Sequence, residues 1–177
     1  MKMKYKQKNI KLGIVSAIAL GSIGLSSASF AGSESANMLV KASVSSSCTI
    51  TTTEINFGTY DSADEAAKSA TTPGNVTYNC TAGTAGTVQI GSGSNVDSDN
   101  PGTDASPNRR MMNSGQYLAY SLYSDLSDTV WGNTAGAGML LAGTGANVPL
   151  PIYGAIAAAQ PSTAGDYLDT VSITLHF

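Results

Sequence analysis

The stretch Tyr167-Leu-Asp-Thr-Val-Ser-Ile-Thr-Leu-His-Phe177 alternates apolar and polar residues up to the last position of the sequence. A period of two is typical of a β-strand with one buried face, because successive side chains of a strand point to opposite sides. An open apolar edge at such a strand would invite aggregation. We therefore expect another molecule to supply the missing neighbour of this strand. The apolar row consists of Val171, Ile173, Leu175 and Phe177.

The opposite end of the sequence has the pattern of a secretory signal. Five lysines precede an apolar run at residues 12–25, and Ser29-Phe30-Ala31 places small residues where a signal peptidase reads them. We expect residues 1–31 to be a signal peptide, so that the chain passes through the periplasm. The 177-residue sequence has nine basic and twelve acidic residues, and the five leader lysines leave a net charge near −8 on the remainder. Such a surface disfavours nucleic acid and anionic membranes as partners.

The sequence contains two cysteines, Cys48 and Cys80. In an exported chain they are expected to form a structural disulfide. A metal site or a nucleophilic thiol is the alternative, but His176 is the only histidine and there is no third cysteine. We therefore predict no metal.

Composition and spacing predict an all-β sandwich. Short alternating runs rich in Thr, Ser and Val are separated by Gly, Pro, Asn and Asp, and the sequence has 19 glycines. Pro149 and Pro151 confine their segment to an edge or a bulged strand. Residues 91–108 are expected to form a long surface loop, and residues 62–70 a helical turn. The candidate strands are 38–44, 48–52, 54–60, 75–80, 86–90, 117–123, 146–156 and 167–177, and 136–143 is a strand or a packed turn.

A series of short motifs follows in order along the chain after the leader. The motifs are Cys48-Thr-Ile, Ile55-Asn-Phe-Gly-Thr-Tyr, Val76-Thr-Tyr-Asn-Cys-Thr, Arg109-Arg-Met, Leu118-Ala-Tyr-Ser-Leu-Tyr-Ser-Asp, Val130-Trp-Gly, Ile152-Tyr-Gly and Gly165-Asp-Tyr-Leu-Asp-Thr-Val-Ser-Ile-Thr-Leu. Together they resemble the spore coat protein U domain family, which supplies subunits of archaic (Csu-type) chaperone-usher pili. The resemblance covers nearly all of the chain after the leader, and a single-domain chain of this size is most similar to a major shaft pilin.

The resemblance implies an incomplete immunoglobulin-like β-sandwich that a donated strand completes. Its implied partners are a periplasmic chaperone, an outer-membrane usher, and identical or related pilin subunits that form a homopolymer. The implied product is a surface fibre, or fimbrium, for adhesion and biofilm formation.

The residues after the leader agree with that implication. In residues 36–44, one face of an extended strand would carry Met38, Val40, Ala42 and Val44, whereas Leu39, Lys41 and Ser43 would face the other way. We expect residues 32–46 to be the donor segment and residues 47–177 the pilin domain. The alternative is that residues 38–44 form the first strand of their own domain.

Other functions fit the sequence less well. Asp97-Ser-Asp-Asn-Pro-Gly102 resembles the start of a calcium loop, but Pro101 occupies a ligand position and Asn108 stands where a bidentate glutamate is needed. No nucleophile motif accompanies His176, so we expect neither an enzyme nor a cofactor or small-molecule substrate. Trp131 and the tyrosines of residues 117–123 are interpreted as core or edge packing rather than as a sugar platform. A minor or tip-proximal binding subunit, or a secreted coat-layer protein, is the alternative to a shaft subunit.

Overall fold

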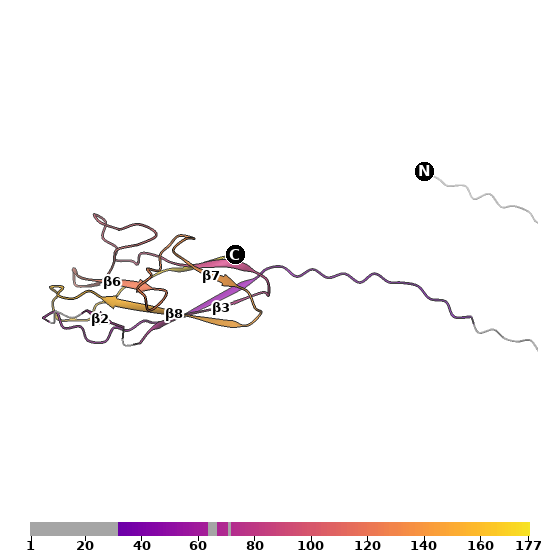
Figure 1. Cartoon of the computed structure of the whole chain (residues 1–177), viewed down its shortest axis with the longest axis horizontal. Helices are drawn as coiled ribbons and strands as arrows, with labels where there is room; N and C mark the ends of the chain where they lie inside the picture. Colours follow the sequence, from indigo (N-terminus) through magenta and orange to yellow (C-terminus); the bar gives the residue numbers. More distant parts are fainter. Residues whose placement is uncertain (1–31, 64–66, 71) are drawn as a thin grey trace, which may run out of the picture. The chain divides into compact units, whose positions relative to one another are not determined.

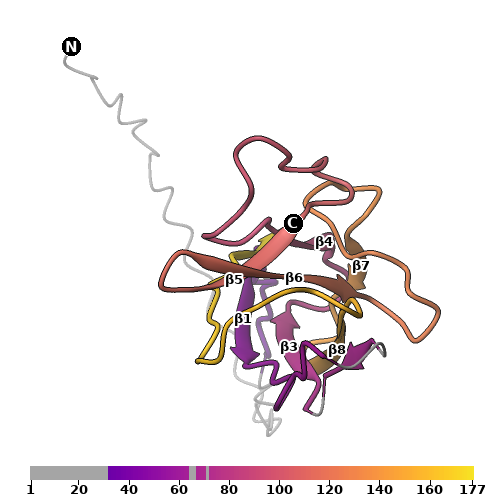
Figure 2. The same cartoon turned by 90° about the vertical axis from the view of Figure 1, so that its left-hand side faces the viewer.

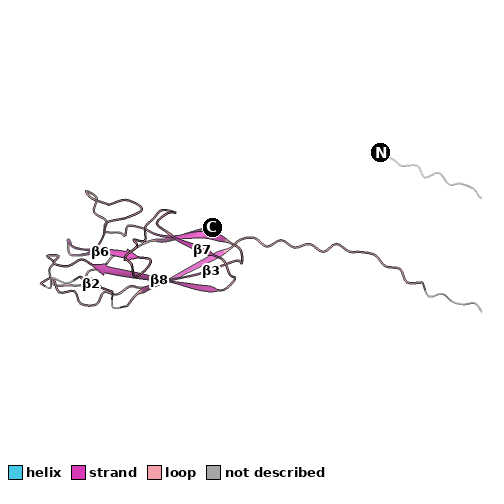
Figure 3. Ribbon diagram, in the orientation of Figure 1, coloured by secondary structure: helices cyan, strands magenta, loops and turns pink. Residues whose placement is uncertain are grey.

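The computed structural model describes residues 32–63, 67–70 and 72–177, so the predicted signal peptide lies outside the described residues. The described part contains nine strands and no helix (Figure 3). Accordingly, no helix in these residues is able to span a membrane. Residues 42–177 form one compact unit, and residues 32–41 belong to a separate one.

The strands form two antiparallel sheets (Figures 1 and 2). The larger sheet has the order β1-β3-β8-β6-β5, and the short β2 pairs with β8. The smaller sheet has the order β7-β4-β9. The strand bounds are β1 Cys48–Thr53, β2 Lys68–Ser69, β3 Gly74–Cys80, β4 Ala85–Ile90, β5 Arg109–Asn113, β6 Gln116–Tyr123, β7 Met139–Ala142, β8 Asn147–Ile156 and β9 Ile173–His176.

The core lies where the apolar faces of the sheets meet. Alternate residues of β3 are buried, which is the period expected of a strand with one face against a core. Trp131 is fully buried and donates its indole N–H to the Val88 carbonyl at 2.9 Å, so it is a core residue and not part of an exposed platform. The buried apolar residues are Phe57, Val76, Tyr78, Cys80, Val88, Ile90, Leu118, Tyr120, Leu122, Trp131, Leu141, Ile152 and Ile156.

Several local predictions differ from the structure. Residues 54–60 contain only an isolated bridge between Asn56 and Thr72 instead of a strand. The predicted helical turn is wrong at β2, where pairing with β8 favours an extended backbone, and residues 64–66 lie outside the described part. Residues 38–44 form no strand, since a strand needs a neighbour for its backbone groups. The loop at 91–108 is confirmed (Figure 2), and 136–143 contains β7.

The two prolines of β8 lie where only one neighbour pairs with the strand. Residues 147–152 of β8 pair with β3, whereas β6 pairs only with residues 153–156. Pro149 and Pro151 are exposed and directed away from the core. The missing N–H groups therefore fall on a half of the strand that behaves as an edge, as predicted.

The disulfide between Cys48 and Cys80 is confirmed. The two residues are direct partners in the β1–β3 ladder, with a Cα–Cα distance of 4.1 Å and a sequence separation of 32. The bond therefore fixes β1 to β3 at the end of the strand where the chain enters the sandwich.

Replacing Cys48 or Cys80 by serine is expected to lower the free energy of unfolding by about 3–4 kcal/mol, because an unfolded chain without the cross-link has more conformational freedom. Denaturant titration of the subunit with and without the bond measures this change. Mass analysis after alkylation provides the control, and two free thiols in the native protein would contradict the pairing.

Candidate functional site

The outer edge of the last strand lacks a neighbour in the described part of the chain. β9 pairs with β4, and the pairing continues before β9, where Gly91 N–H donates to the Ser172 carbonyl at 2.8 Å and Ser94 N–H donates to the Thr170 carbonyl at 3.0 Å. Backbone groups of a strand alternate between its two sides. The N–H and C=O groups of Val171, Ile173 and Leu175 therefore point to the open edge.

The predicted apolar row of this strand has its side chains on the core side. Val171, Ile173 and Leu175 are half-buried and pack against the core. Phe177 stays 61% exposed. Each half-buried residue thus presents an incompletely covered apolar side chain next to unpaired backbone groups, which is the arrangement that an added strand completes.

A second open edge belongs to β1. Among the described residues β1 pairs with β3 alone, and Thr81 N–H donates to the Ser47 carbonyl at 2.9 Å. Because backbone groups alternate between the two sides of β1, the N–H and C=O groups of Ile50 point away from β3. The Ile50 side chain packs, half-buried, against the same core as β9.

A surface cavity of about 970 Å³ lies where the continuations of these two edges meet. One wall is residues 54–62, which follow β1, and the other is residues 162–168, which lead toward β9. Its apolar lining includes Ile55, Phe57, Met111, Leu118 and Ile156.

Glycine at position 154 allows the first wall to pack onto the sheet. A Cβ at Gly154 would lie 2.8 Å from Ile55 Cδ1 and 2.9 Å from Phe57 Cζ. Any larger residue in this part of β8 would therefore displace the wall that follows β1.

A carboxylate fixes the chain where the second wall ends and the approach to β9 begins. Asp169 accepts hydrogen bonds from the backbone N–H groups of Ser94 and Asn95 at 2.9 and 3.2 Å, and from the Tyr120 hydroxyl at 2.6 Å. Burial, together with this hydrogen bond, raises the pKa of Tyr120, so its hydroxyl remains a donor. Asp169 therefore ties the approach to β9 to both the 91–108 loop and β6.

A buried arginine joins the two sheets beside this carboxylate. Arg109 of β5 donates to the carbonyls of Gly91 at 2.7 Å, Ile90 at 2.9 Å and Trp131 at 2.7 Å. Burial lowers the pKa of Arg109 to about 10, and Tyr120 and Asp169 oppose that shift. The guanidinium therefore stays charged at neutral pH and holds β4 in place, and β9 pairs with β4.

The predicted donor residues are all exposed and form no strand. Met38 and Val44 are 84% exposed, and Leu39 and Val40 are each 77% exposed. Residues 32–47 therefore present apolar side chains to solvent.

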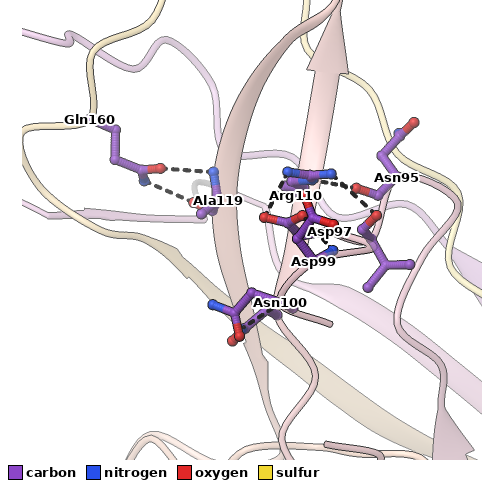
Figure 4. Close-up of polar contacts among 9 residues, drawn as sticks. Asn95, Asp97, Asp99, Asn100, Arg110, Ala119 and Gln160 are labelled. Atoms are coloured by element: carbon purple, nitrogen blue, oxygen red, sulfur yellow. Dashed lines mark hydrogen bonds and ion pairs between the residues drawn. The ribbon is translucent and has the colours of Figure 1, made fainter. Parts of the chain in front are cut away.

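The rejected calcium motif has a different partner. Asp97 lies 3.0 Å from the Arg110 guanidinium, and its other oxygen accepts the Asp99 N–H (Figure 4). The described residues hold no cluster of three or more His, Cys, Asp or Glu that is able to bind a metal.

Sequence reasoning identified the edge strand but not the residues that position it. Arg109 and Asp169 lie inside the motifs that resemble the family, but local alternation indicates no role for either residue. The run Arg109-Arg110-Met111-Met112 does not alternate between apolar and polar residues, so local periodicity predicts neither β5 nor an inward arginine.

Comparisons with known proteins agree with this architecture. Residues 34–174 match the Spore Coat Protein U domain. "Protein U" of Myxococcus xanthus is 33% identical over 178 residues, covering 95% of this chain and 98% of that protein.

Among solved structures, the CsuC–CsuE chaperone–tip adhesion subunit pre-assembly complex from archaic chaperone-usher Csu pili of Acinetobacter baumannii matches with a TM-score of 0.53 and 20% identity. The match covers 76% of this chain and 40% of that chain. This likeness agrees with the predicted immunoglobulin-like sandwich. With the domain match spanning most of its length, the chain belongs to the Spore Coat Protein U domain family and is a structural protein rather than an enzyme.

Proposed function

We propose that this chain is a subunit of an archaic chaperone-usher pilus and polymerises by donor-strand exchange. The observation that carries the proposal is the pair of open strand edges of β1 and β9, whose half-buried apolar side chains pack against one core. The cavity lies between residues 54–62, which follow β1, and residues 162–168, which lead toward β9. An extended segment placed there gains backbone hydrogen bonds from the edges and apolar contacts from the lining.

Residues 38–44 have the properties of that segment. The row of Met38, Val40, Ala42 and Val44 would enter the groove of a neighbouring copy, and its transfer from water would contribute about 5–8 kcal/mol before ordering costs. A slip of one residue would turn Leu39, Lys41 and Ser43 inward instead. Because burying the Lys41 ammonium is costly, the charge specifies the register.

The same groove explains the need for other partners. Before assembly, a periplasmic chaperone covers the open edges, and an outer-membrane usher then joins subunits into a fibre at the cell surface. Support for a chaperone comes from the matched complex, which contains a chaperone and a subunit of Csu pili.

A major shaft subunit is the favoured role, in a fibre that serves adhesion and biofilm formation. It is supported by the presence of one sandwich together with one exposed apolar segment. A secreted coat-layer protein is the second candidate, because the match to Protein U extends over nearly the full length of both chains.

Val40→Asp is expected to abolish polymerisation, because a carboxylate would enter the apolar groove of the neighbouring subunit. Leu39→Asp is the matched control: Leu39 is equally exposed at 77%, but it belongs to the row that faces away from the groove. Polymer ladders that survive detergent without heating provide the measurement.

Lys41→Ser serves as a second control and is expected to polymerise like the wild type. If Val40→Asp and wild-type subunits give the same ladder, residues 38–44 are not the donor strand.

The isolated subunit is expected to aggregate when it is expressed without a chaperone, because the apolar row of β9 and the cavity lining stay uncovered. Moving a copy of residues 36–46 to the C-terminus through a flexible linker should instead give a soluble monomer that unfolds at a higher temperature. Light scattering and thermal unfolding measure both effects. A stable, soluble monomer of the unmodified subunit would contradict the open groove.

A further inference from the structure

Ile55 and Phe57 pack the first wall of the cavity against the core, and backbone hydrogen bonds add to this attachment. Residues 54–62 belong to no strand. Asn56 and Thr72 exchange two backbone hydrogen bonds of 3.0 Å, and this bridge fixes the beginning of the wall. Its far end needs another attachment, and that attachment is a tyrosine.

Tyr60 attaches the far end to the turn that follows β8. Its hydroxyl donates to the Ala157 carbonyl at 3.1 Å and accepts the backbone N–H of Gln160 at 2.9 Å. The ring lines the cavity and packs, half-buried, against the core. The Tyr60 hydroxyl thus binds two residues that lie 97 and 100 positions after it in the sequence.

Gln160 in turn attaches this turn to the larger sheet. Its side-chain carbonyl accepts the Ala119 N–H at 2.8 Å, and its amide donates to the Ala119 carbonyl at 2.9 Å (Figure 4). The amide also donates to the Ala157 carbonyl at 3.1 Å. Ala119 lies in the part of β6 that precedes its pairing with β8, so the glutamine side chain takes the place of a neighbouring strand there.

These contacts oppose a collapse of the empty cavity. The wall lies beside apolar lining that is incompletely covered, namely the half-buried Met111 and Tyr167 and the 73% exposed Leu168, and burying apolar surface favours closure of the wall onto this lining. Closure would require Tyr60 to leave its two backbone partners. Polar bonds that are satisfied only in the open position therefore favour that position.

We infer that Tyr60 and Gln160 are positioning residues that keep the cavity open for the donated strand. This inference rests on the proposed function. With the bonds in place, the incoming segment meets a preformed groove. Without them, each insertion must first lift the wall from the apolar lining, which lowers the rate of exchange.

The test uses the full-length subunit purified together with its periplasmic chaperone, and a fluorescent peptide of residues 36–46 as the probe. Tyr60→Phe removes only the hydroxyl and is expected to slow peptide incorporation by about 5–10-fold, the equivalent of one or two lost hydrogen bonds. Gln160→Met is also expected to slow peptide incorporation.

Tyr78→Phe is the matched control. The Tyr78 hydroxyl also donates to a backbone carbonyl, that of Ala142 at 3.3 Å, but Tyr78 does not line the cavity. In the subunit with a C-terminal copy of the donor segment, both tyrosine variants should lower the unfolding temperature to a similar extent. Only Tyr60→Phe should change the exchange rate.

Equal exchange rates for Tyr60→Phe and Tyr78→Phe, or faster exchange for Tyr60→Phe, would overturn the role of Tyr60. A wild-type complex that never incorporates the peptide would instead refute donor-strand exchange itself, and this inference with it.

Discussion

The unpaired backbone beside an incompletely covered core is the constraint on which the rest of this structure depends. Val171, Ile173 and Leu175 show it most clearly, since each has a half-buried apolar side chain and main-chain groups directed at an open edge. Water satisfies those groups only while the edge stays exposed, and exposure leaves apolar surface uncovered. The sandwich thus has a stable arrangement for most of its strands but lacks a neighbour at one place.

Other contacts hold the open edges of β1 and β9 in position although no strand of the described residues lies between them. The disulfide fixes β1 to β3. On the opposite wall, Asp169 connects the approach to β9 with Tyr120 and with the loop after β4. Arg109 binds three carbonyls between the sheets. The disulfide and these polar bonds therefore hold the strands beside the groove in position, as apolar packing holds the strands in the core. They keep the groove in a shape that a strand can enter.

Local alternation was enough to predict most strands and the terminal apolar row, and the two cysteines of a chain expected to be exported were enough to predict the disulfide. Local alternation failed where the pattern is not apolar. β5 begins with Arg109-Arg110, and only the tertiary fold reveals that the first arginine points inward. The reverse error occurred at 54–60, where Ile55 and Phe57 alternate like a strand, yet the segment becomes a cavity wall. Contacts between distant residues, such as that of Tyr60 with Gln160, leave no trace in local periodicity.

The prolines of β8 bear on how many neighbours a subunit accepts. Pro149 and Pro151 remove donors from the half of β8 that β6 does not reach, Leu168 pairs with Met112 beside β5, and β7 is only four residues long. Each of these edges is a poor template for a further strand. Under the proposed donor-strand exchange, a subunit with one receptive groove and one strand to give would link head to tail, and the fibre would grow in one dimension without side branches.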